Sequence, residues 1–453
     1  MVYDETEGLS ELLATQKVTA YIGFDPTAAS LHVGSLLTVM GLARLQRFGH
    51  TPIAIVGGGT GMIGDPSGKS QERVLLDTEQ IAINVAGIRS QLERFLDFDA
   101  ASNAARIVNN ADWLGTIDLL SFLRDAGKHF TVNYMLQKES VSRRLESEDG
   151  ISFTEFSYLV LQAYDFLQLF DRYGCVLQMG GSDQWGNITA GIDLIRKLRV
   201  AKAHGLVWPL MKTAAGTKFG KTEAGTIWLD PQRTSPFRFY QFWLNVDDRD
   251  VIAYLKCFTF LDRHTIDALA AATAESPERR EAQRVLAREV STVVHGADQV
   301  ARVERASSVL FSEDIASLPL EDLMAVMADV PSTEMSRSEL GVEGVGIVDL
   351  IARVRLAPSK SEARRLVQSG GVYLNNRRAA DLQAKISTSP SPSTRGPTSS
   401  CASQRTVLAT ILARSSSPVR QNVASTSPAR WASRDLPRSR STTAGLLVCG
   451  ARL

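Results

Sequence analysis

Residues 19–56 decide the fold, and they read TAYIGFDPTAASLHVGSLLTVMGLARLQRFGHTPIAIV. The stretch opens with a short apolar run that ends at Asp25-Pro26, and it closes with a second one at residues 52–56. Between them an apolar-rich segment of helical character runs from Leu31-His32 to about Phe48. A strand, a helix and a strand within about 40 residues predict a βαβ unit, and hence an α/β fold with a parallel sheet.

Two further polar motifs follow predicted strands in the same way. The glycine-rich segment from Gly57 to Gly64 comes directly after residues 52–56, and the segment GGSDQWGN from Gly180 to Asn187 follows a short apolar run at 175–178. In open α/β sheets, ligands bind beyond the carboxyl ends of the strands. We therefore expect these two motifs and the segment that begins at Asp25 to form one pocket.

The composition is that of a globular chain with two or three domains. The chain has 453 residues, of which 44% are hydrophobic and 22% charged, and its net charge of +1 neither requires nor excludes a nucleic-acid partner. No apolar run is long enough to cross a membrane, and nothing at the N-terminus is typical of a signal peptide. The 4 cysteines are scattered and no HExxH motif occurs, so we expect no disulfide framework and no protein-bound structural metal. These features favour a cytoplasmic protein.

The segment from Gly59 to Gly64 matches GxGxxG, the fingerprint of dinucleotide-binding proteins. That fingerprint requires a helix at its last glycine, whereas turn-forming residues follow here from Asp65 to Gly68. A P-loop ending at Gly68-Lys69-Ser70 would need a glycine at Ile63. Two interpretations remain. Either the glycines only let the backbone turn, or they let a ligand lie against the main chain. Their close spacing favours the ligand-binding interpretation.

Two other motifs suit phosphate binding, although neither is specific by itself. The pentapeptide from Leu31 to Ser35 opens a helix, whose N-terminus favours an anion, and Gly34 permits close approach. A single histidine such as His32 is nevertheless more often a core residue. Lys218-Phe-Gly-Lys221 suits a loop that closes on phosphates, but two lysines alone equally describe a solvated basic turn.

The combination of motifs is far more specific than any one of them. Histidine and glycine after the first strand, followed by a lysine loop, is the paired signature of class I aminoacyl-tRNA synthetases. The sequence segments around these motifs resemble those of the bacterial-type tyrosyl-tRNA synthetases, and the resemblance covers roughly residues 5–386. They are YIGFDPT at 21–27, GMIGDPS at 61–67, FTEFSY at 153–158, QAYD at 162–165, GGSDQWGN at 180–187 and KFGKT at 218–222.

This resemblance implies a Rossmann-like catalytic domain that activates L-tyrosine with ATP and transfers it to tRNA(Tyr). The substrate phenol would be bound by Tyr21 and Asp165, its ammonium group by Asp65, Tyr158 and Gln162, and the tyrosine also by Gln184. The residues implied in ATP binding are Asp25, Gly34, Ser35, Lys69, Gly181, Asp183 and Lys221. Thr27, His32, Lys218 and Lys221 would stabilise the pyrophosphate portion in the transition state, and ATP would arrive with Mg²⁺.

Two positions depart from the family's pattern. Ser35 stands where the histidine–glycine motif usually ends in a second histidine, and a hydroxyl can still donate one hydrogen bond there. Ile22 stands where the family often has a cysteine that touches the ribose. Isoleucine cannot make that contact, so we expect a modest loss of ATP affinity.

The resemblance also implies the domain organisation and the partners. We expect a homodimer formed by a helical insertion near 118–150, and an S4-like module that binds tRNA through Lys360, Arg364 and Arg365. The expected segments are a catalytic domain at 1–230, a helical anticodon-arm domain at 231–330, a linker at 331–345, the S4-like module at 346–386 and a low-complexity, disordered tail at 387–453. The Ser/Pro/Arg-rich tail stands where relatives complete the S4-like module, as a reading-frame change would produce, and relatives usually begin earlier than Met1.

Two alternatives stay open at this point. The related tryptophanyl enzyme is disfavoured because Tyr21 with Asp165 suits a phenol. A catalytically impaired, synthetase-like RNA-binding protein would explain Ser35 and the unusual tail. The presence of Lys218, Lys221, His32 and Asp183 argues against it.

Overall fold

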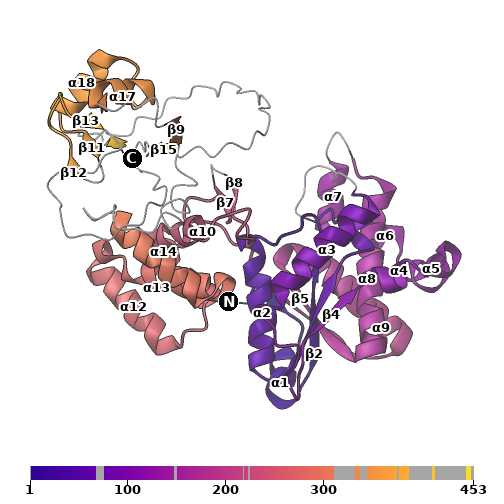
Figure 1. Ribbon diagram of the computed structural model, residues 1–453. Coiled ribbons are helices and arrows are strands. Elements are labelled where there is room, and N and C mark those ends of the chain that lie inside the picture. The colour runs from indigo at the N-terminus through magenta and orange to yellow at the C-terminus, as the bar shows by residue number, and fades with distance from the viewer. Residues whose placement is uncertain are drawn as a thin grey trace. The chain divides into compact units, whose positions relative to one another are not determined.

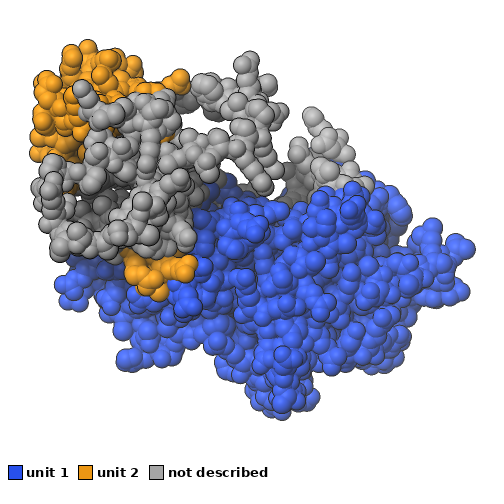
Figure 2. Space-filling model, viewed as in Figure 1, with its two compact units in different colours: residues 1–300 blue, residues 301–453 orange. Residues whose placement is uncertain are grey.

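The computed structural model describes residues 2–67, 76–146, 150–217, 219–222, 225–310, 332–336, 344–374, 377–386, 411–413 and 445–449. The chain forms two compact units, Met1–Val300 and Ala301–Leu453, which Figure 2 colours separately.

A six-stranded sheet lies at the centre of the first unit. Its strands are β1 (Asp4–Glu5), β2 (Thr19–Phe24), β3 (Thr51–Val56), β4 (Arg106–Asn109), β5 (Cys175–Gly181) and β6 (His204–Trp208). Their spatial order is β1-β6-β5-β2-β3-β4; β1 is antiparallel to β6, and the other neighbours are parallel. The inner strands are apolar and buried, as parallel strands covered on both faces must be. The predicted βαβ unit and parallel sheet are confirmed.

The strand order places a topological switch point at β2. From β2 the chain passes through α2 (Leu36–Arg47) to β3 and then outward to β4, and only later returns to the other side of β2 as β5. At such a point the connections leave two neighbouring strands in opposite directions, which opens a crevice beyond their carboxyl ends. The polar motifs after β2 and β5 therefore lie on either side of one crevice.

Helices cover the sheet, as Figure 1 shows. Besides α2 they include α1 (Leu9–Thr15), α3 (Thr78–Leu92), α8 (Phe153–Tyr173) and α9 (Trp185–Arg199). The side chain of Ser152 caps α8 by accepting the amide of Glu155, and Gly174 ends it with φ 60°. Phe166 from α8 is fully buried in the core that α8 and α9 form with the sheet.

Four short helices follow β4. They are α4 (Ala111–Leu114), α5 (Leu119–Asp125), α6 (Val132–Leu136) and α7 (Glu139–Leu145). Beyond the sheet, the strands β7 (Lys221–Thr222) and β8 (Gly225–Thr226) pair as a small antiparallel ribbon. The chain then becomes helical, with α10 (Pro236–Leu244), α11 (Asp248–Phe258), α12 (Arg263–Glu275), α13 (Glu281–His295) and α14 (Ala297–Leu310).

The second unit contains a small α/β cluster. Its described elements are β9 (Ser332–Ser336), β10 (Val345–Gly346), α17 (Ile347–Arg353), α18 (Lys360–Gln368), β11 (Val372–Leu374), β12 (Arg377–Arg378), β13 (Lys385–Ile386), β14 (Ile411–Ala413) and β15 (Gly445–Cys449). The side chain of Ser359 caps α18 by accepting a hydrogen bond from the backbone N–H of Glu362. In the tail, β14 pairs with β11 and β15 with β9. No helix among the described residues is long and apolar enough to cross a membrane.

Candidate active site

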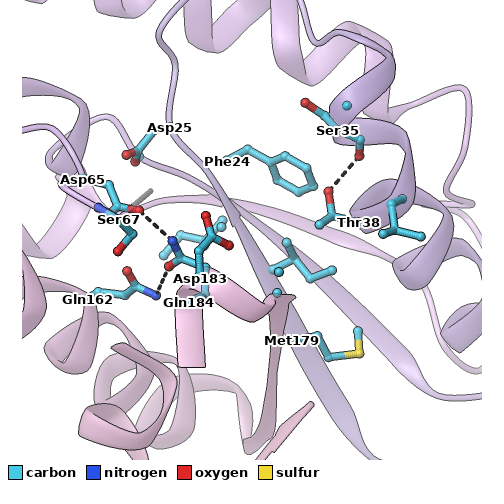
Figure 3. Close-up of a pocket in the computed structure, with 18 of the residues that line it drawn as sticks. Phe24, Asp25, Ser35, Thr38, Asp65, Ser67, Gln162, Met179, Asp183 and Gln184 are labelled. Carbon is cyan, nitrogen blue, oxygen red and sulfur yellow. Dashed lines mark hydrogen bonds between the residues drawn. The ribbon is translucent and has the colours of Figure 1, made fainter. Parts of the chain in front are cut away.

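A pocket of about 370 Å³ opens beyond the carboxyl ends of the central strands. It is lined by residues of all three predicted motifs, among them Asp25 after β2, Gly57 and Thr60 after β3, and Asp183 after β5. Figure 3 shows side chains from these loops pointing toward the same space. The prediction that the three motifs form one pocket is confirmed.

The tyrosine side chain at position 21 and the carboxyl group at position 165 share one end of the pocket. Tyr21 comes from β2 and is 1% exposed, and its ring packs against Phe166 at a centroid distance of 5.2 Å. Within the described part of the chain, its buried hydroxyl has no hydrogen-bond partner. A buried hydroxyl without a partner is costly, so this end of the pocket is suited to a ligand that carries a polar group.

Two side chains that the sequence motifs did not identify hold Asp165. Asn110 Nδ2 donates to one carboxyl oxygen at 2.9 Å, and Trp113 Nε1 donates to the other at 2.7 Å. Both donors follow β4, in a segment without a recognisable motif. Complete burial raises the pKa of Asp165 to about 7, although the bonds from Asn110 and Trp113 oppose the shift.

Two more residues that are predicted to bind the substrate lie on the same face of α8. Tyr158, Gln162 and Asp165 are four and three residues apart and therefore lie on one side of the helix. Tyr158 donates its hydroxyl proton to Asp25 Oδ2 at 2.9 Å. Burial, and then the charges of Asp25 and Asp65, raise the pKa of Tyr158 well above its ordinary value, so it acts as a neutral donor.

Amide side chains connect Gln162 to Asp65 across the pocket (Figure 3). Gln162 Nε2 donates to Gln184 Oε1 at 3.1 Å, and Gln184 Nε2 donates to Asp65 Oδ2 at 2.7 Å. Asn187, to which the sequence motifs assign no role, donates to Gln162 Oε1 at 3.0 Å. Four carboxyl groups, those of Asp25, Asp65, Asp165 and Asp183, line this pocket, and such a concentration of acceptors suits a cationic group.

At the other side of the pocket, His32 is oriented by the start of its own helix. Its Nδ1 accepts the backbone N–H of Gly34 at 3.0 Å, so the neutral ring carries its proton on Nε2. Thr27, Gly34, Ser35 and Ile22 also line the pocket here. The imidazole, a helix start and a hydroxyl together offer donors for an anion.

The glycines after β3 mainly allow close contacts within the protein. A Cβ on Gly57 would lie 2.4 Å from Asp25 Oδ1, and one on Gly58 would lie 2.2 Å from Asn109 Oδ1. The residues from Gly64 to Ser67 are not helical, so the dinucleotide fingerprint does not apply. On the opposite loop, a Cβ on Gly181 would meet Asp183 Oδ1 at 2.6 Å, so this glycine lets Asp183 fold back at the pocket's edge.

The predicted basic residues are described to different extents. Lys69 and Lys218 lie outside the described residues, and of Lys221 only the backbone is described, in β7. In the second unit, Lys360, Arg364 and Arg365 lie on α18, where all three are exposed. Lys360 pairs with Asp349 at 2.7 Å. Among the described residues, no group of three or more His, Cys, Asp or Glu side chains could hold a metal ion.

Comparison with known proteins gives two family matches that together extend over most of the chain. The family model for tRNA synthetases class I (W and Y) matches residues 13–312, and the model for a tyrosine–tRNA ligase SYY-like C-terminal domain matches residues 322–394.

Similar curated and solved proteins agree with these matches. The chain is 57% identical to a tyrosine–tRNA ligase of Roseiflexus castenholzii, over 85% of this chain and 91% of the relative, and 53% identical to that of Geobacillus stearothermophilus, over 84% and 89%. The crystal structure of a C-terminally truncated mitochondrial tyrosyl-tRNA synthetase of Aspergillus nidulans superimposes with a TM-score of 0.63 at 32% identity, covering 69% of this chain and 91% of that one.

Proposed function

The chain belongs to the tyrosine–tRNA ligase family of class I tRNA synthetases, and we propose that it activates L-tyrosine with ATP and transfers it to tRNA(Tyr). In the first step the tyrosine carboxylate attacks the α-phosphorus of ATP, and the bond to the pyrophosphate breaks. In the second, a hydroxyl of the terminal ribose of the tRNA attacks the acyl carbon, and AMP leaves. Neither step requires a protein nucleophile, so the work of the protein is positioning and charge stabilisation.

The observation that carries this proposal is the pairing of Tyr21 with Asp165 at the buried end of the pocket. A phenol placed there accepts a hydrogen bond from the unpartnered Tyr21 hydroxyl and donates its own proton toward the Asp165 carboxylate. An indole has no oxygen to offer at this place, which disfavours tryptophan. The ammonium group of the substrate is then assigned to Asp65, Tyr158 and Gln162, with Gln184 beside them.

The phosphate chemistry is assigned to the opposite side of the pocket. We propose that Thr27 and His32 contact the pyrophosphate portion of ATP in the transition state. The side chains of Lys218, Lys221 and Lys69 are proposed to supply positive charge to the same phosphates. Asp25, Gly34, Ser35, Gly181 and Asp183 are the proposed contacts of the rest of the nucleotide. Mg²⁺ is proposed to arrive bound to the phosphates of ATP, where it neutralises part of their charge.

The alternative of a catalytically impaired RNA-binding protein finds no support. The curated relatives, at 51–57% identity, are tyrosine–tRNA ligases, and Tyr21, His32 and Asp165 all line the pocket. The exposed basic residues of α18 are proposed to contact tRNA phosphates. The proposed compartment is the cytoplasm, where translation consumes charged tRNA.

Tyrosine-dependent exchange of pyrophosphate into ATP tests the activation step. We expect exchange with tyrosine, and exchange lower by several orders of magnitude with phenylalanine or tryptophan, because neither can satisfy both Tyr21 and Asp165. Folded protein that catalyses no exchange with tyrosine, or that exchanges equally well with phenylalanine, would contradict the proposal. Charging of tRNA(Tyr) by the same preparation tests the second step.

We further propose that the enzyme is a homodimer formed through the helical insertion near 118–150. Large apolar side chains are exposed in this region: Leu119, Leu120, Leu123, Val132, Leu136, Leu145 and Phe153. Leu120 is 77% exposed and Phe153 is 79% exposed. Exposed apolar side chains gathered in one region are typical of an interface, and a second copy of the same surface would cover them.

Sedimentation equilibrium of the protein and of two charged variants tests the dimer. The native chain is expected to be dimeric at micromolar concentration. Leu120→Glu buries a charge in the interface and should weaken association at least about tenfold, whereas Val200→Glu, at a position that is 92% exposed on another part of the unit, should not. A native chain that sediments only as a monomer would exclude the proposed interface.

A further inference from the structure

Phe219 is a buried aromatic residue in an otherwise polar loop. In the sequence it follows Lys218 and precedes Gly220-Lys221, and its side chain is only 5% exposed. Its ring contacts four aromatic rings on α10 and α11, at centroid distances of 4.9 Å to Tyr254, 5.2 Å to Phe258, 5.7 Å to Trp243 and 5.8 Å to Phe242. The Phe258 ring is stacked on it with an interplanar angle of 16°. These contacts anchor the loop at Phe219, because aromatic rings contribute both buried area and specific geometry.

The backbone beside Phe219 contacts the helix start that carries His32. Gly220 has φ 83°, and a Cβ there would lie 2.8 Å from Val33 Cγ2 and 3.2 Å from the nitrogen of Gly34. The N–H of Val33 in turn donates to the carbonyl of Ile227, which follows β8. The residue after Phe219 therefore packs directly against the backbone at the proposed phosphate site.

The aromatic cluster is fixed to the same helix at its other end. Arg44 lies on α2, and its Nη2 donates to three carbonyl groups at the C-terminal end of α11, those of Lys256, Cys257 and Thr259, at 3.0, 2.7 and 2.9 Å. A cation at this end of a helix is favourable both for the unpaired carbonyls and for the helix dipole. The helix that carries Tyr254 and Phe258 is thus held to α2.

These contacts form a closed ring through the first unit. It runs from the 3₁₀ turn Val33–Ser35, which leads into α2, through Gly220 to Phe219. From Phe219 it continues through the aromatic neighbours to α11, and from α11 through Arg44 back to α2. This closed series of contacts fixes the backbone of Phe219 and Gly220, between the two lysines, relative to the turn at Val33 and Gly34, beside the proposed phosphate site. A residue that served only to fill a core would not need to lie in the loop that carries the lysines.

We propose that Phe219 is a positioning residue for adenylate formation, whose aromatic contacts hold the backbone of Phe219 and Gly220 in place against the turn Val33–Ser35 that leads into α2. The inference rests on the proposed function. It assigns Phe219 to the turnover of bound substrates and not to tyrosine binding, because Tyr21 and Asp165 lie at the buried end of the pocket and belong to other elements.

Two substitutions at position 219 test the proposal. Phe219→Ala is expected to lower kcat of tyrosine-dependent pyrophosphate exchange about 30-fold, since misplacing a catalytic loop by about 1 Å is enough for losses of this size. The dissociation constant of tyrosine, measured by equilibrium dialysis, should change less than about twofold. Phe219→Leu refills most of the aromatic cluster and should restore kcat to within about fivefold of the native value.

A buried phenylalanine of the same helical region is the control. Phe239 on α10 is 0% exposed and contacts Trp243 and His295. Phe239→Ala should lower the Tm at least as much as Phe219→Ala but keep kcat within about threefold, because it leaves the ring contacts of Phe219 in place. Equal kinetic losses in the two variants, or a Phe219→Ala enzyme that turns over normally, would overturn the proposal.

A double-mutant cycle separates this proposal from the proposed function itself. If Phe219 acts through the stacked Phe258 ring, Phe258→Ala should lower kcat similarly, and the double variant should lose little more than either single one. Fully additive losses would count against the positioning role. A native enzyme without any tyrosine-dependent exchange would instead contradict the proposed function.

Discussion

Replacing Asp165 with asparagine is expected to lower kcat/KM for tyrosine about 10³-fold, a larger loss than we expect from any other single substitution in the pocket. The carboxyl group accepts hydrogen bonds on both oxygens, from Asn110 and from Trp113. An asparagine keeps the shape but presents an NH₂ group to one of these donors, so a buried N–H loses its acceptor. The hydrogen bond from the substrate phenol to the charged carboxylate is lost as well, and two lost bonds to a buried acceptor are worth about 4 kcal/mol, which corresponds to about 10³-fold.

The same substitution should weaken the preference for tyrosine over phenylalanine. Tyrosyl-tRNA synthetases are themselves the best-known case of a site that rejects an analogue lacking a hydroxyl, by roughly 10⁵ against phenylalanine. Without the Asp165 acceptor the tyrosine hydroxyl keeps only its bond from Tyr21, so Asp165→Asn should narrow the ratio of kcat/KM between tyrosine and phenylalanine by about 10² or more. Tyr21→Phe removes only the buried hydroxyl without a partner and should have the smaller effect.

The pH dependence of tyrosine binding provides an independent readout. The pKa of Asp165 is raised to about 7 by burial, and tyrosine donates its phenolic proton only to the ionised carboxylate. Tyrosine affinity should therefore be full above pH 7 and fall as the pH drops below it, by at most about tenfold per unit. Because the folded pKa lies above the ordinary value of 3.8, the stability that this group contributes is present below pH 4 and lost as the pH rises through 7.

Equilibrium dialysis between pH 5.5 and 8 would measure this effect on the native chain and on Asp165→Asn. The variant has no titrating group at this position, so its tyrosine affinity should be nearly constant over the range. A native enzyme with constant affinity would show that Asp165 does not bind the phenol as an ionised acceptor. A variant that keeps the native pH profile would assign the titration to another group.

The sequence was sufficient to predict the fold because the signals are local. Buried parallel strands are continuous apolar runs, and the turn residues that end them are neighbours in the chain. The strand at 19–24 and the helix after Leu31-His32 follow directly from such runs. Because the carboxyl ends of parallel strands share an edge, the convergence of the three motifs at one pocket also followed from the sequence.

The partners of the site residues could not be predicted in this way. Asn110 and Trp113 are 55 and 52 residues away from Asp165, and neither lies in a motif. Asparagine and tryptophan have no spacing that marks them as donors to a distant carboxylate. The sequence motif assigned no role to Phe219, which stands between the two lysines. Its aromatic neighbours come from helices α10 and α11, whose packing no local sequence pattern specifies.

The replacement of Gly34 by alanine is the second large effect that we expect, with kcat for adenylate formation lowered about 10²-fold. A Cβ at this position would lie 2.7 Å from Cε1 and 2.8 Å from Nδ1 of His32. The imidazole ring must then move, and the hydrogen bond that it accepts from the Gly34 N–H is lost. A donor displaced from the charge that it stabilises in the transition state costs about 10²–10³ in kcat.

The effect should be specific to the phosphate side of the pocket. Tyrosine affinity depends on Tyr21 and Asp165, so its dissociation constant should be unchanged in Gly34→Ala. Gly186→Ala is the matched control, because the nearest atom to a Cβ at Gly186 is Lys138 Cδ, at an ordinary 3.5 Å. That glycine lies within α9, where alanine is favoured over glycine by about 0.5–1 kcal/mol, so the control should be active and slightly more stable.

A comparison with His32→Ala identifies the route by which Gly34 acts. If alanine at position 34 acts by displacing the imidazole ring, then adding Gly34→Ala to a His32→Ala enzyme should lower kcat by less than about threefold, because the ring that it would displace is already absent. If the two losses are instead fully additive, Gly34 acts independently of His32. The close approach that this glycine allows would then be to the nucleotide, and the orientation of His32 by the Gly34 N–H would be incidental to the chemistry.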